Sequence, residues 1–598
     1  MLINPPHIRE IPYSRNGVNE FVEDLSSTPG APATKLLLTY PTVYVIKDAK
    51  ASSCEIYIGE SNDIERRTIQ HLTADVKEGN FWHSFERSKN SSMYVIGHDH
   101  FNKSLTLDVE NRLMLYLPGV EHVSKVHNGR ANPQRAYYSQ ENFDEIFNQI
   151  WGQLRTFDKK LFPAKEVIRD SALFKASPFH KLTEEQERGK GEVVNYIYEC
   201  LADDSRQHLV TVSGEAGAGK SVFISSLFYE LFQGDNAVDS PFEFQSLNAY
   251  LLVNHDEQLT VFEQIAKKLN IYNRGTEGKG DLPRVLKPTS FINRTTLDEP
   301  VDVLLIDEAH LLWTQGKQSY RGKNQLKDLI DRAHVVVAVF DEKQIMATNQ
   351  YWDETDRKWL EENTTKQIML RDQMRIDSSP TTYAWLRALI DCGVVGELDL
   401  NPDNADEYGY QVRIFEDPTE MHEAIKEKAS TTERGLSRML ATYDWDYSNN
   451  KKPNNGIDIY WSVNIGDFSL PWNRETDRDQ DRVTKRRTKD LAWAEKEHSL
   501  NEVGSTFTIQ GFDLNYAGVI LGPSVKYRDG KIIHDPTESK NSGAKYRRTM
   551  SDGTKHSVGE QLLANELNVL LTRGVNGLYI YATDEALREK LRESVRAI

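Results

Sequence analysis

The sequence has few cysteines, and they are far apart. Only Cys54, Cys200 and Cys392 occur among 598 residues, and no Cys-x-x-Cys pair is present. This spacing argues against a disulfide framework and against a zinc ribbon. Isolated thiols are typical of proteins from a reducing compartment.

Long apolar runs are also missing. No stretch of about 18 apolar residues occurs, and the first residues lack a basic segment followed by an apolar one. We therefore expect a soluble cytoplasmic protein without a membrane partner.

The chain has no excess of basic charge. It contains 90 acidic residues against 73 lysines and arginines, which gives a formal net charge of −17. This balance excludes a protein that coats nucleic acid with its whole surface. It leaves room for an enzyme with a local basic groove, because a handful of basic side chains is enough to contact phosphates.

A strand–loop–helix pattern with regularly spaced glycines follows a β-branched run. Gly214, Gly217, Gly219, Lys220 and Ser221 form the spacing Gly-x4-Gly-Lys-Ser of a phosphate-binding loop. In such a loop, backbone N–H groups surround the phosphates, the lysine reaches the β and γ oxygens, and the serine ligates Mg²⁺. The pattern predicts ATP and Mg²⁺ as cofactors.

Further along, a nearly continuous apolar run from Val301 to Ile306 ends in the carboxylates Asp307 and Glu308. Such a run is typical of a buried parallel strand, and α/β sheets bind ligands at the carboxyl ends of their strands. We expect Asp307 to hold Mg²⁺ and Glu308 to polarise the attacking water.

Other polar residues have positions that suit a nucleotide site. Gln186 lies at a helix start before the loop and could pair with the adenine edge, although a surface glutamine in a capped helix start is the alternative. Gln344 follows a third core strand and could sense the γ-phosphate. Arg375 could reach the nucleotide from the side, or form a salt bridge instead.

Near the N-terminus, five residues share strand and helix positions that suit phosphodiester hydrolysis. Tyr44 and Tyr57 lie in two expected strands, Arg67 and His71 lie four apart on one helix face, and Glu110 lies in an apolar helical segment. The alternatives are ordinary strand aromatics, a solvated helix face and a member of an ion pair.

The tripeptides ending at Tyr44 and Gly59, together with this spacing, resemble the GIY-YIG endonuclease family, although Thr42 stands where that family often has glycine. The resemblance implies that Tyr44 takes a proton from water with help from Tyr57 or His71. It also implies that Arg67 neutralises developing charge and that Glu110 holds one divalent ion. The family's asparagine corresponds to Asn128 or Asn132, of which Asn128 is preferred.

From about residue 170 onward, the order of motifs resembles a superfamily I helicase core, and the bacterial Schlafen-like helicase/ATPase group in particular. The resemblance implies two RecA-like folds that clamp ATP, with Arg573 as the arginine finger, although a salt bridge stays the alternative for this residue. It also implies that Thr508, Gln510 and Gly511 link the state of ATP to nucleic-acid contact.

The predicted fold class is α/β, with a small α/β nuclease domain followed by two RecA-like domains. The expected parts are an extended arm over 1–40, a GIY-YIG domain over 41–157, a linker over 158–176, and RecA-like domains over 177–395 and 396–598. The second RecA-like domain carries insertions. The charged stretch 474–489 either follows phosphates or forms a solvated face.

These patterns predict an ATP-dependent helicase or translocase on nucleic acid, expected to be DNA, joined to a metal-dependent endonuclease. Such a combination suits phage defence or DNA processing. One alternative is an ATP-hydrolysing switch that senses nucleic acid without unwinding it. Another is an N-terminal unit that only binds DNA. DNA versus RNA and the oligomeric state stay open.

Overall fold

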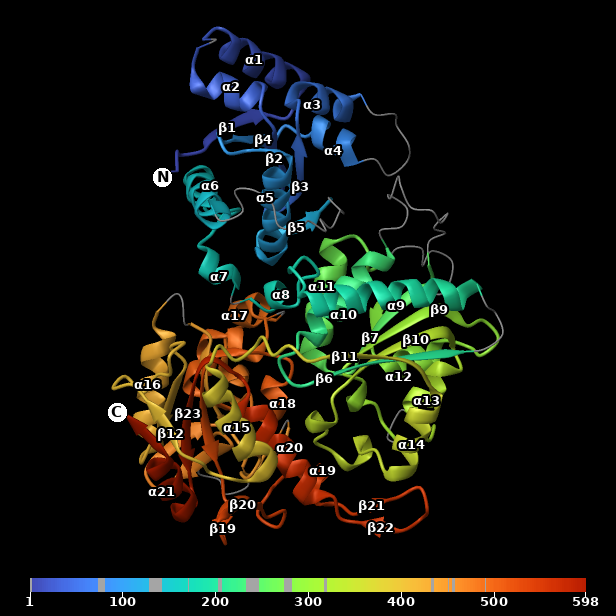
Figure 1. Cartoon of the computed structure of the whole chain (residues 1–598), viewed down its shortest axis with the longest axis vertical. Coiled ribbons are helices and arrows are strands. Elements are labelled where there is room, and N and C mark those ends of the chain that lie inside the picture. Colours follow the sequence, from blue (N-terminus) through green and yellow to red (C-terminus); the bar gives the residue numbers. More distant parts are fainter. Residues whose placement is uncertain are drawn as a thin grey trace. The chain divides into compact units, whose positions relative to one another are not determined.

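The computed structural model describes the chain except for residues 1–2, 29, 74–80, 128–141, 170, 203–206, 233–246, 274–281, 317–319, 432–434, 450, 454–457, 490 and 598, and the side chain of His83. The chain divides into two compact units (Figure 1). The first comprises residues 1–181, 229–246 and 262–284, and the second comprises 182–228, 247–261 and 285–598. The domain bounds that we predicted differ from this division and stay predictions.

The first unit contains a five-stranded sheet in the order β1-β4-β2-β3-β5. The pairs β1–β4, β4–β2 and β2–β3 are antiparallel, and β5 is parallel to β3. The strands are β1 (His7–Pro12), β2 (Thr42–Ala49), β3 (Cys54–Ser61), β4 (Ser91–Gly97) and β5 (Val123–Val126).

Helices cover this sheet on both faces. Tyr44 and Ile46 of β2 share a core with Phe21 and Ile64, whereas α5 packs on β2 and β3. As a result β2 is buried along almost its whole length. The helices are α1 (Arg15–Ser26), α2 (Pro32–Leu38), α3 (Ile64–Leu72), α4 (Phe81–Arg87), α5 (Lys103–Tyr116), α6 (Phe143–Phe157), α7 (Lys165–Arg169) and α8 (Ala172–Lys175).

The first forty residues form part of this unit and are not an extended arm. Strand β1 pairs with β4 from His7–Gly97 to Pro12–Ser92, which extends the sheet. Helix α1 begins at the N-cap Ser14, whose side chain accepts a hydrogen bond from the N–H of Gly17. Its apolar face joins the core, and this burial stabilises the segment against the rest of the unit.

The second unit contains two parallel sheets, which we call the first and second lobes. The first lobe is built on a six-stranded sheet in the order β11-β6-β10-β9-β7-β8, with every neighbouring pair parallel. Its strands are β6 (His208–Gly214), β7 (Ala249–Val253), β8 (Val285–Leu286), β9 (Val301–Asp307), β10 (Ala333–Phe340) and β11 (Thr364–Leu370).

Helices connect these strands and lie on both sides of the first sheet (Figure 1). Both α9 and α13 pack on β10, and this coverage accounts for the apolar runs of β9 and β10. The helices are α9 (Glu184–Ala202), α10 (Lys220–Leu231), α11 (Asp256–Lys268), α12 (Pro288–Arg294), α13 (Gln325–Ile330) and α14 (Glu354–Asn363).

The second lobe has a five-stranded parallel sheet in the order β13-β23-β18-β14-β17. Its strands are β13 (Gln411–Ile414), β14 (Ser437–Ala441), β17 (Val503–Gly504), β18 (Leu514–Leu521) and β23 (Gly574–Ala582). Its helices are α15 (Pro380–Cys392), α16 (Pro418–Ala429), α17 (Arg482–Arg487), α18 (Thr506–Ile509), α19 (Ser542–Lys545), α20 (Gly559–Leu571) and α21 (Glu585–Ser594).

Short two-stranded sheets surround the second lobe. They are β12 (Leu398–Leu400) with β24 (Val595–Ala597), β15 (Ser462–Ile465) with β16 (Phe468–Pro471), β19 (Val525–Arg528) with β20 (Lys531–His534), and β21 (Arg548–Thr549) with β22 (Lys555–His556). The two parallel sheets confirm the predicted α/β class. Among the described helices, none combines the length and apolarity needed to span a membrane.

Candidate functional site

The loop between β6 and α10 depends on glycines at two positions with positive φ. Gly217 has φ +96° and Gly219 has φ +70°. A Cβ atom on Gly219 would lie 2.4 Å from Nε2 of Gln186, so a side chain does not fit there. The loop is therefore closely packed as well as sharply curved.

Gln186 is fixed directly on this loop. Its side chain is 1% exposed, its Oε1 accepts a hydrogen bond from the N–H of Thr183 at 3.0 Å, and its Nε2 donates to the Ala218 oxygen at 3.0 Å. The amide thus joins the start of α9 to the loop. Its predicted contact with adenine stays a prediction.

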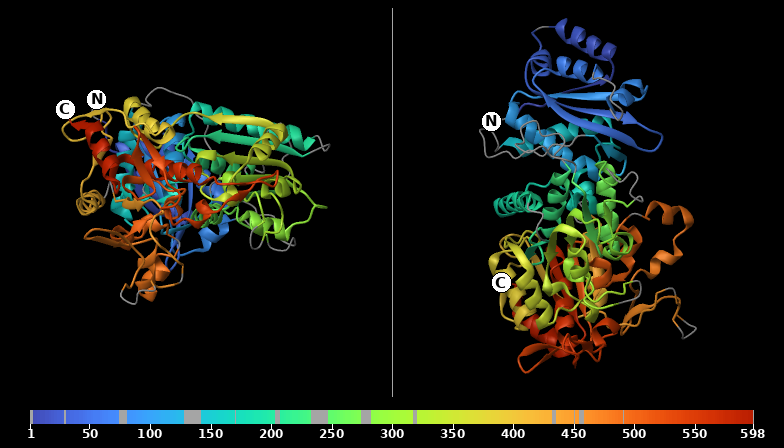
Figure 2. Two further views of the ribbon diagram at one scale, coloured as in Figure 1. Left: turned by 90° about the horizontal axis from the view of Figure 1, so that it is seen from below. Right: turned by 90° about the vertical axis from the view of Figure 1, so that its right-hand side faces the viewer.

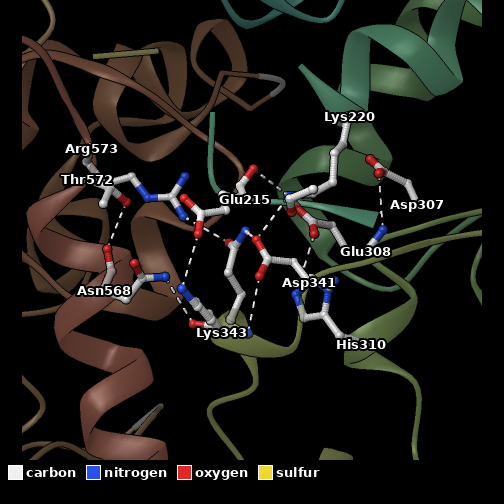
Figure 3. A network of polar contacts seen from close by, with 12 residues as sticks. Glu215, Lys220, Asp307, Glu308, His310, Asp341, Lys343, Asn568, Thr572 and Arg573 are labelled. Atoms are coloured by element: carbon white, nitrogen blue, oxygen red, sulfur yellow. Dashed lines mark hydrogen bonds and ion pairs between the residues drawn. The ribbon is translucent and has the colours of Figure 1, made fainter. Parts of the chain in front are cut away.

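Lys220 lies at the centre of a buried polar network (Figure 3). Its Nζ donates to the backbone oxygens of Gly214 at 2.7 Å and Glu215 at 3.0 Å, and it lies 2.9 Å from Oδ2 of Asp341. Burial alone would raise the pKa of Asp341, but Lys220 and then His310 outweigh it and hold this pKa below its ordinary value.

Asp307 ends β9, and Glu308 follows in the left-handed conformation with φ 50°. Burial, followed by the charge of Glu308, raises the pKa of Asp307. Asp307 Oδ2 and Glu308 Oε2 are buried and accept no hydrogen bond from the residues that the structure describes. Such oxygens are costly unless they meet a cation. Together with the nearby Ser221 hydroxyl, they make a donor set that fits Mg²⁺.

Two residues of this network were missing from the predicted site. Asp341 follows β10, which pairs with both β6 and β9 and therefore ends at the same edge of the sheet. His310 is fully buried, its Nδ1 accepts the N–H of Asp341 at 3.3 Å, and its Nε2 lies 3.4 Å from Glu308 Oε2. The position of Asp341 at the end of a strand was a sequence signal for its role; His310 had none.

The network continues from the first lobe to the second. The Nε2 of Gln344 donates to Asp341 Oδ2 at 2.8 Å, and Nη2 of Arg573 donates to Gln344 Oε1 at 3.3 Å. Arg573 is 1% exposed and also donates to the backbone oxygens of Val569 and Phe512. Burial, and next Arg375, lowers the pKa of Arg573 to about 9.

Helix α20 holds the two lobes together beside this network. Asn565 donates to the backbone oxygens of Glu342 at 3.0 Å and Ile345 at 2.7 Å. Asn568 donates to the Lys343 oxygen at 3.1 Å (Figure 3). These amides fix the helix that precedes Arg573.

The remaining predicted nucleotide residues lie between the same lobes. The Nε of Arg375 is 2.6 Å from Oδ1 of Asp513 in the second lobe. Gln510 is buried, and its Nε2 donates to no described residue. Gly511 has φ +84°, and a Cβ atom there would lie 2.5 Å from the side chain of Gln258 on α11. Their predicted roles stay predictions.

In the first unit, the structure brings four of the predicted nuclease residues together. The ring centroids of Tyr44 and Tyr57 are 6.0 Å apart, and the imidazole of His71 lies 6.1 Å and 5.6 Å from them. Burial raises the pKa of Tyr44, while the adjacent Arg67 acts in the opposite direction. Gly59 permits this packing, since a Cβ atom there would lie 2.7 Å from the Tyr44 hydroxyl.

The imidazole of His71 is enclosed by aromatic rings. Trp82, outside the predicted site, stacks on its ring at 3.7 Å. Burial and then Arg67 lower the pKa of His71 to about 3. The carboxylate of Glu110 on α5 is close enough to raise the pKa of Tyr57, for which burial is the larger cause. Asn128 and Asn132 lie outside the described residues.

Comparison with known proteins identifies the second unit. The model of the Schlafen group 3 DNA/RNA helicase domain matches residues 207–584. The uncharacterized protein YPL245W of Saccharomyces cerevisiae is 33% identical over 454 residues, which cover 71% of this chain and 94% of that protein.

Two solved helicase structures are distantly similar. S. cerevisiae Dbp5 bound to RNA and ADP BeF3 has a TM-score of 0.31 and 10% identity, and the match covers 71% of this chain and 90% of that chain. The Pif1 helicase from Candida albicans has a TM-score of 0.27 and 12% identity, over 69% of this chain and 96% of that chain. Because this domain model matches more than half of the chain, the chain belongs to the Schlafen group 3 DNA/RNA helicase family.

Proposed function

We propose that the chain hydrolyses ATP between its two lobes and uses this reaction to translocate on nucleic acid or unwind it, with DNA as the expected polymer. The observation that carries the proposal is the buried chain of contacts from Lys220 through Asp341 and Gln344 to Arg573. It joins the phosphate-binding loop of one lobe to a buried arginine of the other. Closure of the lobes would therefore place cations on both sides of a triphosphate.

Each residue has a role in this proposal. Lys220 neutralises charge on the β and γ oxygens, Glu308 orients the attacking water, and Arg573 stabilises charge that develops as the terminal phosphoryl group leaves. Ser221 and Asp307 would hold Mg²⁺, which supplies Lewis-acid stabilisation of the phosphates when bound.

The test is the substitution Lys220→Ala, which should reduce ATP turnover by at least about 100-fold, since it removes a cation from the developing charge. Turnover is measured as phosphate release. The matched control is Lys343→Ala, because this exposed lysine lies in the same region and pairs with Glu215 and Asp391 instead. Turnover that survives Lys220→Ala would contradict the proposal.

An ATP-hydrolysing switch that senses nucleic acid is the alternative use of the same site. Both functions require hydrolysis stimulated by nucleic acid, but only a helicase releases a strand. A strand-displacement assay on forked and blunt duplexes of DNA and of RNA separates them. Stimulated hydrolysis without displaced strand would favour the switch.

We further propose that the first unit cleaves phosphodiester bonds. The supporting observation is that both ring nitrogens of His71 are buried without a hydrogen-bond partner among the described residues, close to the Tyr44 hydroxyl, which interacts with Arg67 and Tyr57. Buried polar groups left in this state are costly, and an active-site ligand or water would satisfy them. Arg67 and Glu110 add the cation and the carboxylate that metal-dependent hydrolysis needs.

The substitution Glu110→Ala should abolish cutting of labelled nucleic acid in the presence of Mg²⁺ and leave ATP turnover within about twofold, because it removes only the metal ligand. Asp108→Ala is the control on the same helix, since residues two apart face different directions. If the parent protein binds DNA without cutting linear, forked, supercoiled or single-stranded substrates, the unit is a targeting module.

A further inference from the structure

The segment that connects β14 to β17 in the second lobe contributes no strand to the five-stranded parallel sheet. Residues 442–502 include the β15–β16 hairpin, a 3-10 turn (Glu475–Asp479) and α17. In the right-hand view of Figure 2 this part of the chain, drawn in orange, lies at the periphery of the second lobe. The matched helicase domain includes it.

Helix α17 is a short helix with no buried residue. Arg482, Lys485, Arg486 and Arg487 are all exposed, as is Lys489 just beyond the helix. Arg482 and Arg486 lie four residues apart and therefore on one face. These five side chains concentrate positive charge on one element of a chain whose net charge is −17.

None of the described acidic residues from 475 to 481 forms an ion pair with a basic side chain of α17, although Asp481 at its N-cap keeps a negative charge. Glu475 pairs with Arg478, Asp477 pairs with Lys496 and His498, Asp479 accepts the hydroxyl of Tyr460, and Asp481 caps the helix.

Within the part of the chain that the structure describes, Arg482, Arg486 and Arg487 form no ion pair. Lys485 donates only to the backbone oxygen of Arg478. By contrast, Arg588 and Arg592 of α21, in the same lobe, both pair with Glu416. Since like charges on one short helix repel each other, an anion from outside the segment would relieve the repulsion.

The segment that carries α17 is also fixed to the first lobe. Arg474 forms an ion pair with Glu257 at the start of α11, and Glu257 Oε2 accepts the N–H of Trp493 at 3.3 Å. These two contacts flank α17 in sequence. A polymer held by α17 would therefore lie on a segment whose flanking residues contact the first lobe.

We propose that α17 and Lys489 bind the sugar–phosphate backbone of a single-stranded nucleic acid. The inference rests on the proposed helicase function and adds a surface to it. Phosphates are the anions expected for a cluster of exposed guanidinium groups, and such contacts need no sequence recognition.

The test compares two variants with equal loss of charge. One is Arg482→Gln, Arg486→Gln and Arg487→Gln together; the control is Arg588→Gln, Lys590→Gln and Arg592→Gln on α21. Binding of labelled single-stranded DNA and RNA oligonucleotides to the full chain is measured by fluorescence anisotropy between 50 and 300 mM KCl. Each lost phosphate contact lowers the slope of log Kd against log salt by about 0.7 for a single strand.

We expect the α17 variant to bind at least about tenfold more weakly at low salt and to lose about 2 from the slope, while the α21 variant keeps both values. Thermal unfolding of the α17 variant should match that of the parent, because its three arginines make no internal ion pair. Equal losses in the two variants, or none in the α17 variant, would overturn the inference. If the parent binds neither oligonucleotide, the proposed helicase function fails as well, and an acidic protein becomes the expected partner of α17.

Discussion

Glu566 of α20 is a buried carboxyl group that contacts Thr506, close in sequence to Thr508, Gln510 and Gly511, the residues predicted to link ATP to nucleic-acid contact. One of its oxygens accepts hydrogen bonds from the N–H of Tyr443 at 2.9 Å and the hydroxyl of Thr506 at 3.4 Å, and Oε2 has no described partner. Burial, and next the charge of Asp444, raises the pKa of Glu566 to about 8 from its ordinary 4.5. Near neutral pH the folded protein therefore holds a proton on Glu566 that the unfolded chain has already released at about pH 4.5.

Because the folded-state pKa is raised, the stability that this group contributes is complete below pH 4.5 and is lost as the pH rises through about 8. Glu566→Gln keeps the shape of the protonated acid without its titration. We expect the variant to exceed the parent in melting temperature by a margin that grows from pH 5 to pH 9. Glu560→Gln, an exposed acid on the same helix, should show no such trend. If the melting temperatures of the parent and of Glu566→Gln changed with pH in the same way, the raised pKa of Glu566 would be contradicted.

At the scale of elements, close packing in β3 explains the glycine that ends the second tripeptide. A Cβ atom on Gly59 would lie 2.7 Å from the Tyr44 ring and 2.9 Å from the Tyr57 ring. The neighbouring rings are fixed by the sheet register, in which Tyr44 lies opposite Gly59. A side chain at this position would have to displace both tyrosines.

Gly59→Ala should therefore lower the free energy of unfolding of the first unit by about 1–3 kcal/mol, as overpacked cores do. The measurement is denaturant unfolding followed by tryptophan fluorescence, to which Trp82 and Trp151 contribute from the first unit. The matched control is Gly152→Ala in α6, where a Cβ atom meets nothing within 4 Å. Alanine inside a helix should leave stability unchanged or raise it by up to about 1 kcal/mol. Equal effects from the two substitutions would show that crowding at Gly59 is not the cause.

Several elements could be predicted from local sequence, and others could not. The apolar run of β9 and the glycine spacing before α10 indicate their structures because the signal lies within a few residues. Strand β1 gave no such signal, since its six residues include both His7 and Pro12 and become a strand only by pairing with β4. The burial of β2 along almost its whole length also depends on distant parts of the chain, because helices cover both faces of its sheet.

At the scale of the whole molecule, the two lobes meet through charged and amide groups at the proposed ATP site. The contacts of Asn565, Asn568 and Arg573 with the first lobe are all polar. A ligand that binds this seam should therefore stabilise both lobes against unfolding, because binding to the folded form alone shifts the equilibrium.

Addition of Mg²⁺ and a non-hydrolysable ATP analogue at about 100 times its Kd should stabilise the parent by about 2.7 kcal/mol, seen as a rise in melting temperature. The rise should disappear in Lys220→Ala and persist in Lys343→Ala. The measurement is differential scanning calorimetry at several concentrations of the analogue. If the melting temperature of Lys220→Ala rose as much as that of the parent, the analogue would bind at a site that does not include Lys220.

The sequence by itself determined the phosphate-binding loop, the Asp307–Glu308 pair and the α/β class, because each depends on residues adjacent in the chain or on a simple hydrophobic period. Only the tertiary structure decided that Asp341 pairs with Lys220 and that Gln344 contacts Arg573, because strands distant in sequence must first align their carboxyl ends. It also decided which charges stay unpaired on α17, since ion pairing depends on which side chains meet after folding.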